Sequence, residues 1–334
     1  MARARRLSDG ARALACTLAC TLVFVALAST APAPVAAAGD AAPAAASAQA
    51  NPSWKRIRYG NPRALKLRSQ VGLVVDEDQG IILYARDMDK PRPIASITKL
   101  LTIMTLLDSA LSPDELIEIT RADRDRLKGS RSSLRYATVL SRGELMRIAL
   151  VASDNRAAAA LGRTYPGGTS DLISAMNDKA QALGLEHTRL ADASGLLPGN
   201  VSTARDLARL AYVSRDYPAI NLWSTTRRFS VVDRASGRQL TFRNTNSLVH
   251  RKRWHIEMSK TGFTSEAGNC LLMRTVVGDR SLIVVLLNSW GKHSKYGDSG
   301  RIRDWVVASD RAEDPDGGQA SVEPADDARA DDRV

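Results

Sequence analysis

The sequence predicts an α+β fold, in which an antiparallel sheet is flanked by helices and a helical lobe is inserted between its strands. Paired runs of branched and apolar residues around glycine-containing turns lie on both sides of the middle of the chain, as is typical of β-hairpins. Segments whose apolar residues recur with helical spacing occupy the middle itself. We therefore expect a sheet assembled from parts of the chain that are distant in sequence.

The individual elements follow from these two patterns. Pairs of strands are predicted in residues 71–87, 229–244 and 269–289, each around a short turn that contains glycine. Helices are predicted in residues 96–108, 141–153, 169–184 and 203–215, with a final amphipathic segment at 300–310. In the third helix, Ser170 is placed to cap the N-terminus and Gly184 to end the helix.

The N-terminus has the features of an export signal. Four arginines precede and border an apolar run at residues 13–28, and the small-residue pattern at Ala36 and Ala38 offers a cleavage site. A secretory signal peptide is therefore predicted over residues 1–38. The apolar run is short for a membrane span, and an uncleaved anchor is the alternative interpretation.

The rest of the chain divides by composition. Residues 39–56 are predicted to be a flexible linker rich in Ala and Pro, and residues 308–334 a disordered acidic tail without aromatic residues. The folded domain is expected over residues 57–307. Cys270 is the one cysteine that remains after removal of the signal peptide, so no internal disulfide is expected.

The formal net charge of +11 is unevenly distributed. Of the 47 basic and 36 acidic residues, four Arg and one Asp lie in residues 1–38, and three Arg and nine acidic residues lie in 308–334, which leaves +14 between these segments. Such a balance can indicate nucleic-acid binding, but export removes the chain from nucleic acid, so we expect no such partner. A solvated basic surface and attraction to an acidic wall polymer are the two interpretations.

A serine and a lysine near the start of an apolar helix form the first candidate for chemistry. Ser96 and Lys99 are three residues apart and share a helix face, so the amine can reach the hydroxyl. A serine hydroxyl needs such a base, and burial would lower the pKa of the lysine from about 10.4. The same spacing recurs at Ser289 and Lys292, where we expect a strand end and a loop. In the structural alternative, Ser96 caps the helix and Lys99 extends to solvent.

Two further motifs follow along the chain. Ser153, Asp154 and Asn155 stand at the end of an apolar helical run, where polar residues by themselves would be explained as a helix cap. Residues 260–262 are Lys-Thr-Gly, which by themselves indicate a strand end. A strand with Lys, Thr and Gly side by side can also bind a carboxylate and let its backbone approach a ligand closely.

Together and in this order, the three motifs match a set found in penicillin-binding proteins and class A β-lactamases. From about Arg58 to Trp305 the chain resembles the low-molecular-mass penicillin-binding proteins, which are serine D-alanyl-D-alanine peptidases. Within that family, "KTGFTSEAGNCLLMRTV" and "VVLLNSWGKHSKYGDSGRIRDWV" are most similar to the small periplasmic D-alanyl-D-alanine endopeptidases. The resemblance implies the transpeptidase fold shared by penicillin-binding proteins and β-lactamases.

The resemblance also implies roles for individual residues. Ser96 would be the nucleophile and Lys99 its base. Ser153 would relay a proton, Asn155 would orient Lys99 and the substrate amide, and Lys260 would add positive charge. Substrate binding would fall to Thr261, which would hold a carboxylate, to Gly262, and to Phe263. The backbone N–H of Phe263 would form the oxyanion hole with that of Ser96.

The expected activity is cleavage of cross-links between D-alanine and meso-diaminopimelate in peptidoglycan, in the periplasm and through an acyl-enzyme on Ser96. Peptidoglycan stem peptides would be the substrates and β-lactam antibiotics covalent inhibitors, with no cofactor, no metal, and at most peripheral contact with a membrane. The alternatives are a D-alanyl-D-alanine carboxypeptidase, then a β-lactamase or a non-catalytic wall-binding protein. The region around Glu186 lacks the ExxLN pattern of class A β-lactamases, and the chain contains neither GxSxG nor HExxH.

Overall fold

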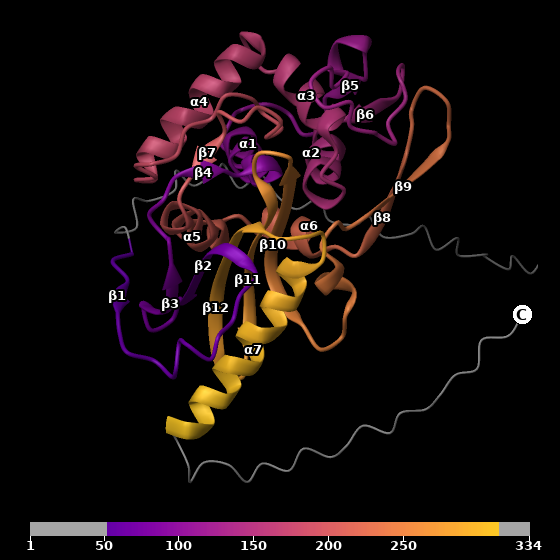
Figure 1. The fold of residues 1–334 in the computed structure, drawn as a ribbon. Coiled ribbons are helices and arrows are strands. Elements are labelled where there is room, and N and C mark those ends of the chain that lie inside the picture. Colours follow the sequence, from indigo (N-terminus) through magenta and orange to yellow (C-terminus); the bar gives the residue numbers. More distant parts are fainter. Residues whose placement is uncertain (1–51, 314–334) are drawn as a thin grey trace, which may run out of the picture. The chain divides into compact units, whose positions relative to one another are not determined.

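Strands from residues 55–86 and from residues 255–289 meet in a central six-stranded sheet. The structure, a computed structural model, describes residues 52–313. The order of the strands is β1-β3-β2-β12-β11-β10, and only β1 runs parallel to its neighbour (Figure 1). The strands are β1 (Lys55–Arg56), β2 (Ser69–Asp76), β3 (Ile81–Arg86), β10 (His255–Thr264), β11 (Gly268–Val277) and β12 (Arg280–Ser289). Because β2 pairs with β12, the predicted assembly from distant segments is confirmed.

The remaining elements include three short two-stranded sheets. These are β4 (Arg92–Pro93) with β7 (Val201–Ser202), β5 (Leu116–Glu118) with β6 (Val139–Ser141), and β8 (Arg228–Val232) with β9 (Gln239–Arg243). The α-helices are α1 (Lys99–Leu107), α2 (Arg142–Val151), α3 (Asn155–Arg163), α4 (Gly168–Ala182), α5 (Ala204–Val213), α6 (Pro218–Thr225) and α7 (Ser294–Glu313). Short 3₁₀ turns are η1 (Ala95–Thr98), η2 (Arg121–Asp123), η3 (Ser214–Asp216) and η4 (Ser247–His250).

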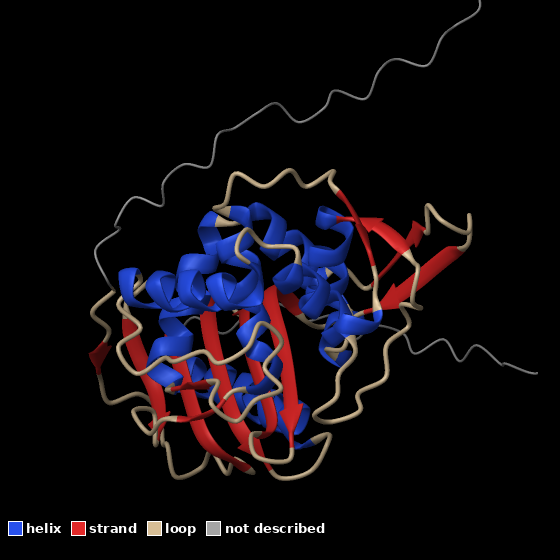
Figure 2. Ribbon diagram, turned by 90° about the horizontal axis from the view of Figure 1, so that it is seen from above, coloured by secondary structure: helices blue, strands red, loops and turns tan. Residues whose placement is uncertain are grey.

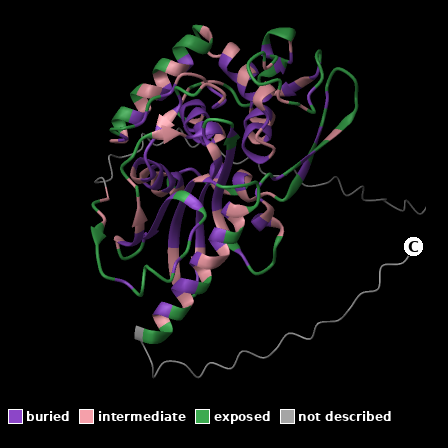
Figure 3. Cartoon of the chain, in the orientation of Figure 1, coloured by how far each residue is buried: buried purple, intermediate pink, exposed green. Residues whose placement is uncertain are grey.

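The sheet is covered on both faces, and its central strands are therefore apolar on both sides. Alternate residues of β2 face opposite ways: Leu73 lies in the core shared with α5 and the helical lobe, whereas Val74 lies in the core under α7. From α7, Ile302 and Trp305 pack into this second core. Figures 2 and 3 show the buried strands between the helices on either side.

Helix α1 is the centre of the helical lobe. Residues 99–106 of this helix are all buried, including Lys99 and two threonines. The helix packs against α2 and α4, and the η1 turn before it lies against β10 and β11. The start of α1 is therefore fixed where the lobe meets the sheet.

The predicted hairpins and four of the predicted helices are present, with differences at their ends. Ser170 is not a cap: α4 begins at Gly168, after Gly167 in the left-handed conformation (φ +77°), and Ser170 is the third residue of the helix. Gly184 follows the helix with φ +65°, as a stop signal should. Helix α3 is alanine-rich and was not predicted. It starts because the carboxylate of Asp154 accepts hydrogen bonds from the N–H groups of its first turn.

Two segments assigned to the linker and the tail belong to regular elements. Strand β1, inside the predicted linker of residues 39–56, pairs with β3, and α7 continues six residues past the predicted boundary at residue 307. Near its end, Asp310 accepts a hydrogen bond from Tyr59 at 2.7 Å and pairs with Arg280 at 2.9 Å. The predicted signal peptide and most of the linker and tail lie outside the described residues. Between residues 52 and 313, no helix is long and apolar enough to span a bilayer.

Asp310→Ala should lower the free energy of unfolding by about 1–2 kcal/mol, because the change removes a shared acceptor of Tyr59 and Arg280. Urea unfolding followed by circular dichroism measures this. The control is Asp304→Ala on the same helix, whose 69% exposed carboxylate pairs only with its neighbour Arg303 and whose loss should change stability by less than about 0.5 kcal/mol. Equal effects of the two substitutions would show that α7 is not held at residue 310.

Candidate active site

The first candidate motif lies in the turn between β4 and α1. Ser96 belongs to η1, and Lys99 is the first residue of α1. Two glycines pack closely on this turn. A Cβ atom added to Gly195, which has φ +83°, would lie 2.0 Å from the carbonyl oxygen of Ala95, and one added to Gly262 would lie 3.2 Å from the backbone nitrogen of Ser96. Gly262 of the Lys-Thr-Gly motif therefore packs against the turn that contains Ser96, and the close approach to a ligand expected of it stays a prediction.

The amine of Lys99 has three oxygen atoms around it. Its Nζ lies 2.9 Å from Ser96 Oγ, 2.6 Å from Asn155 Oδ1 and 2.6 Å from the carbonyl oxygen of Ser194. The last two atoms can only accept hydrogen bonds, so two N–H groups of the amine donate to them. The third tetrahedral direction points to the Ser96 hydroxyl. It holds an N–H in the ammonium form and a lone pair in the neutral amine.

Burial changes the acidity of this amine. Lys99 is fully buried, and the loss of hydration lowers its pKa to about 8. The carboxylates of Asp192, Asp154 and Asp125 act in the opposite direction and keep the pKa from falling further. At pH 7, a pKa of about 8 leaves roughly one tenth of Lys99 as the free base.

The second buried lysine comes from the sheet. Lys260 on β10 is 1% exposed, and its Nζ donates to Ser153 Oγ at 2.7 Å and to the carbonyl oxygen of Thr261 at 2.9 Å. Burial, and next the charges of Lys99 and Lys295, lower the pKa of Lys260 well below its usual value. Deprotonation of Lys260 is therefore easier than that of an ordinary lysine, and an anion bound beside it would stabilise its positive charge.

Each residue of the Ser-Asp-Asn motif faces a different partner. Ser153 has the left-handed φ of +56°, which is rare for a serine, and its hydroxyl meets Lys260. Asp154 caps α3. Asn155, the first residue of α3, accepts from Lys99 and donates through Nδ2 to Ser130 Oγ at 2.9 Å. The motif thus contains a helix cap, as its structural explanation required, and two residues that contact the buried lysines.

The rest of β10 forms the edge of the site. Thr261 is buried, and its hydroxyl lies 2.7 Å from that of Thr245. Phe263 is 65% exposed at the end of the strand. The structure thus brings the eight predicted site residues together at one place. The second SxxK pair is not part of it, because Ser289 ends β12 and Lys292 is in the loop that follows.

Four residues that contribute to the site were not predicted from the sequence: Ser130, Thr245, Asp192 and Ser194. The Asp192 carboxylate accepts hydrogen bonds from the backbone N–H groups of residues 194, 195 and 197 and from the amide of Asn200. These bonds fold residues 192–200 so that the carbonyl of Ser194 points at Lys99. No motif marks this loop, because its contribution to the site comes from the main chain.

Comparison with known proteins agrees with this geometry. Residues 59–291 match the model of the peptidase S11 family, described as D-alanyl-D-alanine carboxypeptidase. The chain belongs to this family. A D-alanyl-D-alanine endopeptidase of Pseudomonas aeruginosa is 44% identical to this chain, and the match covers 75% of this chain and 80% of the relative. The D-alanyl-D-alanine endopeptidase of Escherichia coli is 41% identical, over 72% of this chain and 78% of its own.

A solved structure confirms the predicted fold. Penicillin-binding protein D2 from Listeria monocytogenes, in an ampicillin-bound form, superposes on the peptidase with a TM-score of 0.63. The two are 27% identical, and the match covers 73% of this chain and 98% of the other. The transpeptidase fold of penicillin-binding proteins is therefore the fold of this chain.

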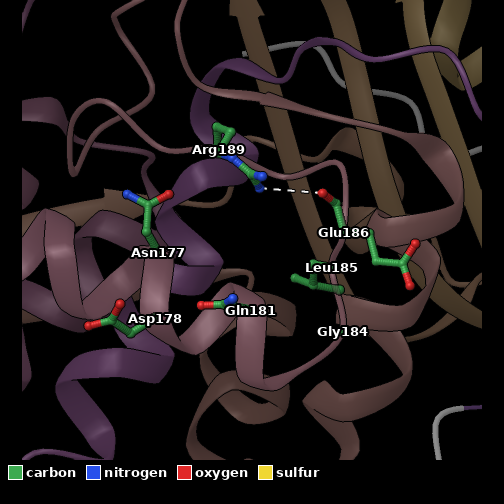
Figure 4. Close-up of a pocket in the computed structure, with 7 residues that line it drawn as sticks. All are labelled: Asn177, Asp178, Gln181, Gly184, Leu185, Glu186 and Arg189. Atoms are coloured by element: carbon green, nitrogen blue, oxygen red, sulfur yellow. Dashed lines mark hydrogen bonds between the residues drawn. The ribbon is translucent and has the colours of Figure 1, made fainter.

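A cavity of about 460 Å³ lies apart from these residues, beside α4 (Figure 4). Its lining is formed by Asn177, Asp178, Gln181, Gly184, Leu185, Glu186 and Arg189. Glu186, the glutamate near the position where a class A β-lactamase has its own, is exposed in this lining. Within residues 52–313 its carboxylate forms no hydrogen bond to a predicted site residue, so it does not provide a base beside Ser96.

A third lysine near the site is buried as well. Lys295 of α7 is 5% exposed, and burial lowers its pKa to about 8. Within the described part of the chain, no hydrogen bond or ion pair of its ammonium group is found, and a ring contact with Tyr296 at 5.4 Å is its one close interaction. Lys295 therefore has no strong partner to offset the loss of hydration.

Lys295→Met should raise the free energy of unfolding at pH 7 by about 1–3 kcal/mol, because it removes a poorly solvated charge. Below pH 8 the lysine is protonated in both states, and the difference between variant and wild type is largest. Between pH 8 and 10.5 the unfolded chain binds more protons than the folded chain, so the wild type gains stability and the difference closes. Thermal unfolding over this pH range measures the difference in stability between the variant and the wild type. Exposed Lys292→Met is the control, and a pH-independent difference would contradict the prediction.

Proposed function

We propose that the protein is a periplasmic serine peptidase that hydrolyses the bond between D-alanine and meso-diaminopimelate in cross-linked peptidoglycan, through an acyl-enzyme on Ser96. The observation that carries the proposal is the buried pair of Lys99 Nζ and Ser96 Oγ, 2.9 Å apart, in which two carbonyl acceptors direct the third position of the amine at the hydroxyl. That arrangement suits a neutral lysine acting as general base.

In the acylation step, Ser96 Oγ attacks the carbonyl carbon of D-alanine and its proton passes to Lys99 Nζ. The oxyanion of the tetrahedral intermediate would be held by the backbone N–H groups of Ser96 and Phe263. The C–N bond then breaks, which leaves an ester on Ser96. Water subsequently attacks the ester carbon and loses a proton, which replaces the one that Lys260 gives to the departing amine. The C–O bond breaks, and Ser96 Oγ takes back its proton from Lys99.

The departing amine needs a proton, and Ser153 is placed to supply it. The Ser153 hydroxyl would give its proton to the amine nitrogen and receive one from Lys260, with which it shares the 2.7 Å hydrogen bond. Lys260 must be protonated for this. A substrate carboxylate held by Thr261 would favour the ammonium form of Lys260. Binding of the correct substrate would therefore provide the proton that Ser153 passes on.

The endopeptidase assignment rests on the relatives. Those from P. aeruginosa and E. coli that match most of this chain are named D-alanyl-D-alanine endopeptidases. The family as a whole carries the description carboxypeptidase, and this is the second candidate, because terminal D-alanine and meso-diaminopimelate both present a carboxylate beside the scissile bond. We further propose that stem peptides are the natural substrates, that β-lactams acylate Ser96, and that residues 1–38 direct export.

The purified protein should convert cross-linked peptide dimers into monomers and leave monomers ending in D-Ala-D-Ala unchanged, as followed by mass spectrometry. Loss of one D-alanine from such monomers, without cleavage of dimers, would support the carboxypeptidase instead. Ser96→Ala should abolish cleavage and covalent labelling by fluorescent penicillin while the far-UV spectrum stays the same, because the change deletes one oxygen atom. Labelling that survived in this variant would exclude Ser96 as the nucleophile.

The rate constant for acylation by penicillin should rise with pH and level off above the pKa of Lys99, about 8. Well below that value, the neutral fraction grows about tenfold per pH unit, so the rate should do the same. Asp125→Asn should shift the curve to lower pH, because the Asp125 charge raises the pKa of Lys99. Stopped-flow measurements between pH 5.5 and 9.5, roughly, cover the range in which the amine titrates. A flat profile would exclude Lys99 as the base.

A further inference from the structure

The loop between β5 and β6 is unusually basic. Residues 121–135, here called the cationic loop, contain five arginines and one lysine but only two acidic residues, a net charge of +4. The loop connects two strands at the edge of the helical lobe (Figure 1). All five arginines are exposed: Arg121, Arg124, Arg126, Arg131 and Arg135.

The acidic residues of the cationic loop are already engaged by other groups. Asp123 pairs with Arg163 of α3 at 2.8 Å. Asp125 accepts hydrogen bonds from the backbone N–H groups of residues 127, 128 and 130. Among the residues that the structure describes, no hydrogen bond or ion pair involves the side chain of any of the five arginines. Their charges are therefore not neutralised within the protein.

The conformation of the loop does not depend on these arginines. Ser130 accepts a hydrogen bond from Asn155 at 2.9 Å, and the guanidinium group of Arg156 donates to the carbonyl oxygen of Leu134. With the contacts of the two aspartates, these bonds hold the loop at both ends and in the middle. A fixed backbone thus presents five free cations, so little loop ordering is needed when an anion binds, and the ordering cost is confined to the arginine side chains.

The cationic loop lies beside the catalytic lysine and serine. Ser130 contacts Asn155, which in turn accepts from Lys99. On the other side, Lys128 forms an ion pair with Glu266, in the turn that follows Phe263 and the end of β10. The loop therefore bridges the helical lobe and the sheet at the active site, and the free arginines surround these two contacts in the sequence.

We infer that the cationic loop is a docking surface for the carboxylate-bearing stem peptides of polymeric peptidoglycan, beyond the bond that is cleaved. The inference rests on the proposed function, because the wall substrate it names is the one proposed above. Several unpaired cations at the rim of a site raise the local concentration of an anionic substrate and its association rate, and salt weakens this effect. A small β-lactam bears one carboxylate, so its reaction at Ser96 should depend on the charges of the cationic loop far less than that of a polymer with many carboxylates.

The test compares two triple variants with the same loss of charge. The loop variant is Arg124→Gln/Arg126→Gln/Arg131→Gln, and the control is Arg251→Gln/Lys252→Gln/Arg253→Gln. The control residues are equally exposed but precede β10, whose length places them roughly 25 Å from Phe263. Penicillin acylation should proceed at the wild-type rate in both variants, which shows that each is folded with an intact site.

The decisive measurement is the initial rate of cross-link cleavage in purified sacculi at low substrate concentration. At about 0.02 M salt the loop variant should be about tenfold slower than wild type, and at about 0.5 M salt the two should agree. The control should follow wild type at both. Equal rates for the loop variant and wild type at low salt would overturn the inference, as would equal losses in both variants.

Binding separates this inference from the proposed activity. In a Ser96→Ala background, co-sedimentation with sacculi should weaken when the loop arginines are replaced and should not weaken in the control. Amidation of the sacculus carboxylates should remove the difference, and a difference that persists would overturn the assignment to carboxylates. If the wild type bound sacculi through the loop but cleaved no cross-link, the proposed function would fail and the docking surface would stand.

Discussion

The removal of two lysine amines from water, in one place, is the constraint on which the rest of the site depends. An ammonium group transferred from water into a protein interior loses several kcal/mol of hydration, which the protein must replace with acceptors or avoid by releasing a proton. For Lys99 the fold supplies an asparagine and a main-chain carbonyl, and for Lys260 a serine and a main-chain carbonyl. Among the described residues, neither lysine has a carboxylate within hydrogen-bonding distance, and so the charge of each depends on pH and on what binds beside it.

This constraint explains why the chain is folded from distant segments. Lys99 comes from a helix inside the lobe, and Lys260 comes from an edge strand of the sheet. Their partners are close in sequence: Asn155 is the first residue of α3, and Ser153 lies two residues before it. The sheet that pairs β2 with β12 holds the lobe against β10. Without a side chain at residue 262, β10 can lie directly against the turn that contains Ser96. The close packing at Gly262 and the pairing of β2 with β12 therefore both hold the two lysines near their partners.

The sequence predicted well what depends on side-chain chemistry or on simple periodicity. Ser96, Lys99, Asn155 and Lys260 are in the places that their motifs implied, and the hairpins follow the pattern of branched residues. It did not predict the contributions of Ser194 or Thr245, because these depend on which loops the fold brings to the site. The end of α7 was also misplaced. Acidic composition there indicated disorder, whereas Asp310 is held by partners some 30 and 250 residues away. Composition cannot report such contacts.

The carbonyl of Ser194 has a consequence for how this site can change over evolutionary time. Any amino acid at position 194 brings the same acceptor oxygen, so the contact with the Lys99 amine does not depend on the Ser194 side chain, whose hydroxyl instead donates to Asp192 at 2.9 Å. Selection must act instead on what shapes the peptide unit, which here means Gly195, where a Cβ would collide with Ala95, and the carboxylate of Asp192. A mutational scan of position 194 would thus report how well a buried side chain fits beside Asp192, and it would not report the contact with Lys99, which belongs to the main chain.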